Sequence, residues 1–221
     1  MGKVALITGS SRGIGRAIAN KFEVNGYKLL TPSRNEMNLN DNLSIEAYCK
    51  KIEVDIDVII NCAGINTIAT LNELDDADLN SMIQINLLAP LKIIQCLNDK
   101  MGKNRLAHIV NISSIWSFIS KEGRCGYSAT KAGINGMTRT LALEFAPKNI
   151  LINSVAPGYV NTELTKQNNT PQDIANIASL IPLQRLAEPE EIANLVYFLS
   201  SDMNTYITGQ TIIIDGGYIC R

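Results

Sequence analysis

Six short apolar runs, separated by stretches with helical spacing, constrain the fold of this chain more than any other feature. Amphipathic stretches lie between the runs, the clearest of them at 14–26 and 75–101. Strands that are apolar on both faces and alternate with helices are typical of a parallel sheet covered by helices on each side. The sequence therefore predicts an α/β fold, a single doubly wound domain over residues 1–221. Its strands are expected at residues 3–8, 27–31, 54–61, 106–113, 150–156 and 211–215.

Composition excludes several classes of function. Hydrophobic residues make up 46% of the 221 residues, charged residues make up 19%, and the formal net charge is −1. Such a balance gives neither a basic face for nucleic acid nor a polybasic membrane anchor. The apolar runs are too short to span a membrane, and the N-terminus lacks the apolar core of a signal peptide. We expect a cytoplasmic protein with no nucleic-acid and no membrane partner.

Cysteine and histidine usage argues against a metal site. The five cysteines are scattered without a CxxC pair, and His108, the single histidine, lies between apolar residues. This pattern predicts reduced thiols, no disulfide framework and no bound metal. A catalytic triad that depends on histidine is excluded on the same grounds, and His108 is interpreted as structural.

A glycine-rich turn, TGSSRGIG at residues 8–15, connects the first predicted strand to the first predicted helix. Gly9 suits a tight turn, Gly13 allows the backbone to approach a pyrophosphate, and Gly15 permits close packing of helix on strand. An ordinary strand–helix turn is the alternative. The position of the turn in the first unit of an alternating chain favours dinucleotide binding.

The stretch GYSATK at residues 126–131 places Tyr127 and Lys131 four positions apart. Residues at this spacing lie on one face of a helix, so a phenol and an ammonium can reach the same space. Taken alone, the pair has the simpler interpretation of a surface tyrosine and a solvated lysine. The other motifs of the chain decide between the two.

Together these motifs resemble the short-chain dehydrogenase/reductase family. The glycine turn reads TGxxxGIG, and the chain adds NCAG at 61–64, Asn86 within QINLLAP, ISS at 112–114, YSATK at 127–131 and PGYVNT at 157–162. The C-terminal segment 181–218 resembles the 3-oxoacyl-[acyl-carrier-protein] reductase branch. The resemblance runs from Lys3 to Tyr218. It implies a Rossmann-type domain with a mostly parallel seven-stranded sheet.

The resemblance also implies four catalytic residues. Tyr127 would exchange a proton with the substrate oxygen, and Lys131 would lower the Tyr127 pKa and hold the nicotinamide ribose. Ser114 would hydrogen-bond the substrate oxygen, with Ser113 as the alternative hydroxyl. Asn86 would anchor a water that relays protons to Lys131; the alternative is that its amide only satisfies nearby backbone.

A nicotinamide cofactor is implied as well, and two cations indicate which one. Arg34, near the end of the second strand, and Arg12 in the glycine turn favour the 2′-phosphate of NADP. NAD stays open because Glu36 is close enough to bind a ribose 2′-hydroxyl. The implied cofactor contacts are Gly9, Ser10, Ser11, Arg12, Gly13, Ile14, Gly15, Arg34, Asn38, Leu39, Asn61, Ala63, Gly64, Tyr127, Lys131, Pro157, Gly158, Val160 and Thr162.

The chain departs from the family pattern around its second and third strands. Only residues 32–53 separate two strands between which relatives fit a helix, a strand and another helix. Residues 37–41 resemble the end of the usual third strand, and a helix is expected at 44–52. The adenine half of the cofactor site is therefore shortened.

The substrate side is predicted from three features. A segment at roughly 158–188 would form a lid over the cleft. Ile115, Trp116 and Phe118 would form an apolar pocket wall, although large side chains like these are also typical of a core. The helices at 75–101 and 127–146 resemble those that pair subunits, which implies a homo-oligomer, a dimer or a tetramer.

An acyl carrier protein would require basic residues near the mouth of the cleft. The candidates are Lys100, Lys103, Arg105 and Lys148, with simple solvated surface as the alternative.

The sequence as a whole predicts an NADP-dependent oxidoreductase that interconverts a ketone and a secondary alcohol. The expected substrate is a small molecule or an acyl thioester, first of all a 3-oxoacyl thioester or a related ketone. One rival keeps this chemistry and changes the substrate to a sugar, a polyol or a secondary-metabolite ketone. A rival of another class is an NADP-binding sensor or scaffold without turnover, and an epimerase is a third.

Overall fold

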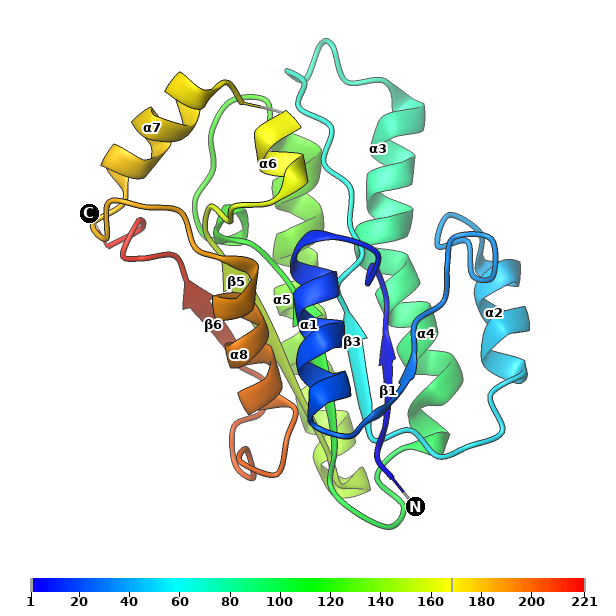
Figure 1. Ribbon diagram of the computed structural model, residues 1–221. Helices are drawn as coiled ribbons and strands as arrows, with labels where there is room; N and C mark the ends of the chain where they lie inside the picture. The colour runs from blue at the N-terminus through cyan, green and yellow to red at the C-terminus, as the bar shows by residue number, and fades with distance from the viewer. Residues whose placement is uncertain (1, 168, 221) are drawn as a thin grey trace.

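The computed structural model describes residues 2–167 and 169–220. Within these residues, six strands form one parallel sheet in the order β2-β1-β3-β4-β5-β6 (Figure 1). The strands are β1 (Val4–Ile7), β2 (Lys28–Leu30), β3 (Val58–Asn61), β4 (Ala107–Ile112), β5 (Ile150–Pro157) and β6 (Thr211–Ile214). The predicted doubly wound α/β fold is confirmed.

Helices cover both faces of the sheet. They are α1 (Gly13–Val24), α2 (Asn42–Lys50), α3 (Asp76–Ile83), α4 (Ala89–Leu97), α5 (Cys125–Phe145), α6 (Glu163–Gln167), α7 (Pro171–Leu180) and α8 (Pro189–Leu199). Helices α2, α4 and α5 pack on one face, and α1 and α8 pack on the other (Figure 1). None of the helices among the described residues has both the length and the apolar character that crossing a membrane requires.

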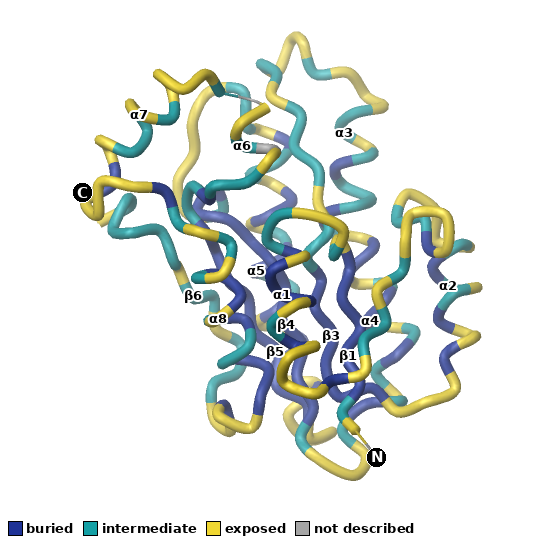
Figure 2. The backbone as a smooth tube through the Cα atoms, in the orientation of Figure 1, coloured by how far each residue is buried: buried dark blue, intermediate teal, exposed yellow. Residues whose placement is uncertain are grey.

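The core consists of two apolar clusters separated by the sheet. Strand β1 contributes to both, because Leu6 points into the cluster beneath α2, α4 and α5 while Ala5 and Ile7 point into the cluster beneath α1 and α8. This alternation follows from the period of two along a strand. The central strands β1, β3, β4 and β5 are accordingly buried along their whole length, whereas the edge strands β2 and β6 are partly exposed (Figure 2).

The prediction of seven strands is wrong. The described residues form six, and no further strand pairs with the free edge of β2. Residues after β2 turn back at once: the Glu36 carboxylate accepts hydrogen bonds from the Ser33 amide and hydroxyl, both at 2.8 Å. Asp41 then caps α2 by accepting from the Leu43 amide at 2.9 Å. Residues 37–40, between this turn and this cap, pair with no strand of the sheet. Met37 instead inserts its side chain into the core, where it is only 3% exposed.

The long helix predicted at 75–101 is interrupted. A π-helical turn, η1 (Gln84–Leu88), separates α3 from α4, and a short 3₁₀ turn, η2 (Asn98–Lys100), ends the stretch. A π turn carries an extra residue per turn, so it changes the direction of side chains within an otherwise continuous helix. Asn86 lies inside this turn and is 1% exposed.

Candidate active site

A cleft of about 410 Å³ lies at the carboxyl ends of the strands, where ligands bind in open α/β sheets. Its walls come from the turn between β1 and α1, the ends of β3, β4 and β5, and the first turns of α5 and α6. The predicted cofactor residues that line it are Gly9, Ser11, Arg12, Gly13, Ile14, Gly15, Ala63, Gly64, Tyr127, Lys131, Pro157, Gly158, Val160 and Thr162. The topology thus gathers residues that are far apart in the sequence.

The glycine turn is held closely against its neighbours. Gly9 has a φ of +72°, and a Cβ there would lie 2.8 Å from the Ala63 Cα. At Gly15 a Cβ would lie 2.0 Å from the carbonyl oxygen of Gly9. These positions require glycine, as the motif predicts, because no larger residue fits without moving the backbone.

The start of α1 fits the pyrophosphate of a dinucleotide. Its N-cap, Arg12, makes no side-chain cap, and no acidic residue stands in the first turn. The unpaired N–H groups at a helix start favour anions, and Gly13, Ile14 and Gly15 turn this end of the helix towards the cleft. The residues present therefore suit a nicotinamide dinucleotide at this end of the cleft.

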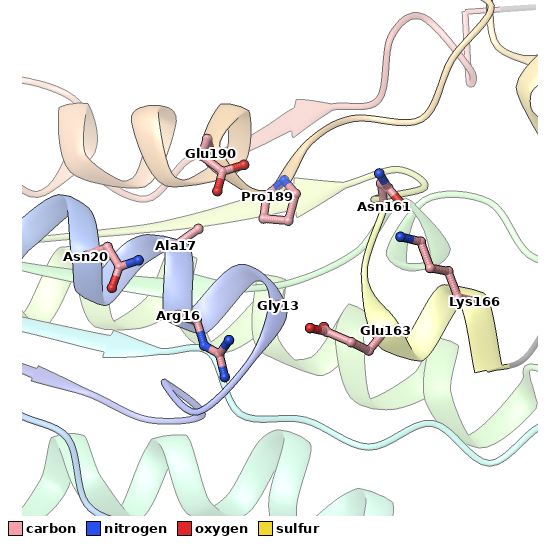
Figure 3. Close-up of a pocket in the computed structure, with 9 residues that line it drawn as sticks. All are labelled: Gly13, Arg16, Ala17, Asn20, Asn161, Glu163, Lys166, Pro189 and Glu190. Carbon is pink, nitrogen blue, oxygen red and sulfur yellow. The ribbon is translucent and has the colours of Figure 1, made fainter.

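A smaller hollow of about 200 Å³ lies beside the glycine turn, between α1, α6 and α8. Glu163 extends from α6 towards the start of α1 (Figure 3). A Cβ at Gly13 would be 3.3 Å from the Thr162 Cγ2 and 3.9 Å from a Glu163 carboxylate oxygen. The first turn of α6 therefore lies directly over the glycine turn.

Tyr127 and Ser114 face the same part of the cleft, although they come from different elements. Ser114 follows β4, and its hydroxyl accepts a hydrogen bond from the Trp116 amide at 3.2 Å. Tyr127 stands in the first turn of α5. Burial raises the pKa of Tyr127, while the hydrogen bond with Ser114 and the charge of Arg124 act in the opposite direction. The pair can hold one substrate oxygen between a donor and a stabilising hydroxyl.

Lys131 lies one helical turn after Tyr127 and is 4% exposed. Its ammonium donates to the Ile112 carbonyl oxygen at 2.7 Å and lies 5.5 Å from the centre of the Tyr127 ring. Burial lowers the pKa of Lys131 to about 8. Lys131 is not among the groups that shift the Tyr127 pKa, which is raised by burial and only partly offset by Ser114 and Arg124, so the lowering of that pKa by Lys131 stays a prediction.

Asn86 reaches the site from the π turn and fixes the loop after β3. Its amide nitrogen donates to the Ile65 carbonyl oxygen at 2.8 Å, and its amide oxygen accepts from the Ile65 amide at 2.9 Å. A third bond joins it to the Thr130 hydroxyl at 3.2 Å. A Cβ at Gly64 would be 3.2 Å from the Asn86 oxygen and 3.6 Å from the Lys131 ammonium. The amide thus satisfies backbone beside Lys131, and the water relay stays a prediction.

The choice between the two serine hydroxyls follows from their partners. Ser113 donates to the Asn135 amide oxygen at 2.7 Å, deep between β4 and α5. The Ser114 hydroxyl is the one that interacts with Tyr127. The Ser113 hydroxyl is therefore engaged in a buried hydrogen bond, and Ser114 is the candidate for contact with substrate.

Five predicted cofactor residues do not line the cleft. Ser10, Arg34 and Asn38 lie beside it on the surface or partly buried, and Leu39 packs against the core. Asn61 is 4% exposed and donates to the Asn111 amide oxygen at 2.9 Å within the sheet. The adenine contacts at Asn38 and Leu39 stay predictions.

The segment predicted as a lid contains α6 and α7, and its two ends are joined. Val160 pairs with Ala187, and the Asn161 amide donates to the Ala187 carbonyl oxygen at 2.8 Å. The Asn161 side chain also donates to the Glu188 carboxylate at 3.0 Å. Helices α6 and α7 lie between these anchors (Figure 1), and α6 contributes Glu163 and Thr165 to the wall of the cleft.

Of the predicted apolar wall, only Trp116 lines the cleft. Ile115 belongs to the core with 1% exposure, and Phe118 is 49% exposed to solvent. Phe118 follows the short turn η3 (Ile115–Ser117), which directs it away from the cleft.

The basic residues considered for a carrier protein lie at the wrong edge of the sheet. Lys100, Lys103 and Arg105 precede β4, and Lys148 precedes β5, whereas the cleft is at the carboxyl ends of these strands. They are also engaged: Arg105 pairs with Asp57, and Lys148 donates to Asn98 at 2.9 Å. A docking site at the cleft mouth built from these four residues is excluded.

Sequence reasoning missed three residues of the site. Arg124 and Tyr159 line the cleft beside Tyr127. Thr8, at the end of β1, accepts from the Cys62 and Ala63 amides at 3.1 and 3.2 Å and so holds the loop after β3. The signal for Arg124 was available, since a cation three residues before the tyrosine shares its helix face.

Comparison with known proteins agrees with this geometry. Residues 36–219 match the family described as enoyl-(acyl carrier protein) reductase. The chain is 38% identical to a 3-oxoacyl-[acyl-carrier-protein] reductase of Aquifex aeolicus and 35% identical to one of Escherichia coli, each alignment covering 98% of this chain and 97% of the relative. A crystal structure of a short chain dehydrogenase family protein from Francisella tularensis superposes with a TM-score of 0.93 at 28% identity, covering 100% of both chains.

Proposed function

The chain is an oxidoreductase of the short-chain dehydrogenase/reductase family, and we propose that it reduces a 3-oxoacyl thioester or a related ketone to the secondary alcohol with NADPH. Members of this family that catalyse such reactions use a nicotinamide cofactor, and the glycine turn at residues 8–15 fits the pyrophosphate of a nicotinamide dinucleotide. The observation that carries the proposal is the convergence of Ser114, Tyr127 and Lys131 on the cleft that the glycine turn also lines. Full-length similarity to 3-oxoacyl-[acyl-carrier-protein] reductases supports the acyl substrate.

In the proposed reaction, each of the four predicted catalytic side chains has one role. The bound nicotinamide supplies the hydride. Ser114 hydrogen-bonds the ketone oxygen, and Tyr127 transfers its phenolic proton to that oxygen as negative charge develops there. Lys131 holds the ribose and stabilises the resulting phenolate through its positive charge. Asn86 keeps the loop at Gly64 and Ile65 in place beside Lys131.

NADP is favoured over NAD by the cations on the adenine side. Arg12 and Arg34 are exposed, and neither forms an ion pair within the described part of the chain. Guanidinium groups suit a 2′-phosphate because they donate in a planar fork. Glu36, the candidate acid for NAD, is instead occupied by Ser33, and these hydrogen bonds lower the pKa of Glu36.

A homo-oligomer, a dimer or a tetramer, is part of the proposal. Apolar side chains are exposed on both helices that were expected to pair subunits: Leu91 of α4 is 41% exposed and Leu143 of α5 is 80% exposed. Gly133 of α5 packs within the chain, since a Cβ there would be 3.0 Å from Leu87. Light scattering of the purified protein measures the assembly directly.

The proposed function is tested by following NADPH absorbance after adding a small acetoacetyl thioester. We expect a saturable fall in absorbance with the natural chain and only a residual rate with Tyr127→Phe. Binding of NADPH without turnover of any ketone would favour a sensor or scaffold. Turnover of sugars or polyols in place of the thioester would move the substrate to the rival class.

A further inference from the structure

Arg124 lines the cleft immediately before α5, and the reaction described above gives it no role. It is the N-cap residue of α5, three positions before Tyr127, and its charge acts on the Tyr127 hydroxyl in the same cleft. Ser114 and Trp116 line the same end of the cleft. Arg124 therefore stands beside the groups that would surround the substrate carbonyl.

Two nitrogen atoms of the Arg124 side chain lack hydrogen-bond partners. Its Nε and Nη1 atoms are buried and make no hydrogen bond, and no carboxylate pairs with it within residues 2–167 and 169–220. Burial lowers the pKa of Arg124, which reflects the cost of removing its charge from water. A guanidinium keeps its charge in proteins, so its five N–H donors need an acceptor.

Aromatic rings surround this charge. The Arg124 Cζ lies 5.9 Å from the centre of the Trp116 ring, and Trp116 meets Tyr159 edge to face at 6.1 Å. Tyr159 in turn contacts Tyr218 at 5.4 Å. Rings that exclude water strengthen a charge-assisted hydrogen bond at the guanidinium.

The cleft itself offers no counter-charge at this end. Among the described lining residues the one carboxylate is Glu163, which lies at the opposite end beside Gly13. The phosphates of a dinucleotide would also lie at that end, over the start of α1. An anion for Arg124 has to come with the substrate.

We propose that Arg124 binds a carboxylate of the substrate, so that the cleft selects ketones that carry a free carboxylate close to the reacting carbonyl, as a 3-oxo acid does. The inference rests on the proposed reductase function and narrows its substrate class from 3-oxoacyl thioesters and related ketones to those ketones that carry a free carboxylate. A neutral thioester would leave the guanidinium charge uncompensated, whereas a carboxylate matches its fork with two parallel hydrogen bonds.

The reaction balances without any further reactant. A 3-oxo acid takes two electrons and one hydrogen as hydride from NADPH at its ketone carbon, and its ketone oxygen takes a proton from the Tyr127 hydroxyl. Solvent returns that proton to Tyr127. The products are NADP⁺ and the 3-hydroxy acid, and the carboxylate on Arg124 keeps its charge throughout.

The test compares acetoacetate with a neutral acetoacetyl thioester of N-acetylcysteamine, which carries the same ketone. For the natural chain we expect kcat/KM to be higher for acetoacetate. Because the charge of Arg124 also acts on Tyr127, Arg124→Gln can slow both reactions, but it should lower kcat/KM ~10–100-fold more for acetoacetate than for the thioester, the usual range for losing a hydrogen bond to a charged group. Arg124→Lys should restore part of the loss. The control Lys103→Gln removes one positive charge at the far edge of the sheet and should change neither rate.

A natural chain that prefers the neutral thioester, or an Arg124→Gln variant that loses equal activity on both substrates, would overturn the inference. Calorimetric titration of acetoacetate into the protein saturated with NADP⁺ separates this result from failure of the proposed function. Carboxylate binding that Arg124→Gln abolishes would uphold the role of Arg124 even if neither ketone is reduced. Absence of binding to the natural chain would refute it.

Discussion

The two sides of the cleft are built in opposite ways. Beneath the candidate catalytic residues, buried polar side chains form a continuous chain of hydrogen bonds: Asn61 to Asn111 at 2.9 Å, Asn111 to Thr138 at 3.0 Å, and Thr138 to Ser154 at 2.7 Å. At the outer edge, after β2, the hydrogen bonds are local and exposed, as between Ser33 and Glu36.

This difference in hydrogen bonding explains why the sheet edge after β2 tolerates substitution better than the region beneath the candidate catalytic residues. Removing one member of a buried polar network leaves its partners unsatisfied at a cost of ~1–3 kcal/mol each, so such networks resist alteration. An exposed edge carries no such penalty, and here the sheet ends at the short strand β2. The reaction chemistry and the cofactor choice are therefore under separate physical constraints.

The largest effect is expected on the catalytic side, from Tyr127→Phe. Removing the phenolic proton should reduce kcat by ~10²–10⁴-fold, the usual contribution of general acid catalysis. The dissociation constant for NADPH, measured by fluorescence titration, should change little because the glycine turn is untouched. A variant that keeps a rate within tenfold of the natural one would show that Tyr127 is not the acid.

Lys131→Met tests whether burying the Lys131 ammonium lowers the free energy of unfolding. The pKa of Lys131 is lowered to about 8 in the folded chain, so the unfolded chain binds more protons between that pH and the ordinary lysine value. The free energy of unfolding should therefore rise with pH across this window, by up to about 3 kcal/mol.

In Lys131→Met this rise should disappear, and turnover should be lost. At pH 7 the variant should unfold at a temperature no lower than the natural chain, because a charge that is costly to bury has been removed. Denaturant titrations at several pH values measure the slope. An unchanged slope in the variant would mean that another group titrates in this range.

Asn86→Ala is expected to have a smaller effect on both properties. It deletes both bonds to the Ile65 backbone and should lower the free energy of unfolding by ~1–3 kcal/mol. Turnover should fall because the loop beside Lys131 loosens, and the matched variant Asn80→Ala, on the exposed side of α3, should be neutral. Equal effects of the two substitutions would remove Asn86 from the site.

The smallest effect is expected at the exposed edge, from Arg34→Ala. It should reduce the preference for NADPH over NADH by ~10-fold, in line with the ~1.4 kcal/mol of one charged contact at a surface phosphate. The control Lys50→Ala, an exposed cation on the nearby α2, should keep the preference. An Arg34→Ala variant with unchanged preference would place the 2′-phosphate elsewhere.

Sequence reasoning predicted the repeating parts of the fold closely. All six apolar runs contain a strand of the sheet, and the family that the motifs resemble is the family to which the chain belongs. Both results follow from patterns that local physics imposes, since alternation of apolar runs and helical stretches needs no knowledge of distant contacts. The glycine positions were equally readable, because close backbone contact at Gly9 and Gly15 permits no other residue.

The errors arose where a distant contact decides the outcome. The apolar pattern of 75–101 did not reveal the π turn that presents Asn86 to Ile65. The sequence of residues 37–41 resembled the end of a strand, yet Met37 is buried in the core and these residues pair with no strand. The basic residues before β4 and β5 could not be assigned to an edge of the sheet until the strand directions were known.

By itself, the sequence determined the parallel α/β architecture, the glycine turn, and the pairing of Tyr127 with Lys131, because each depends on residues close in the chain. Only the tertiary structure decided which serine faces Tyr127, which helix turn holds Asn86, and that two buried nitrogens of Arg124 lack a hydrogen-bond partner. These outcomes depend on how strands and helices distant in the sequence pack together, and burial and hydrogen-bond partners are set at that stage.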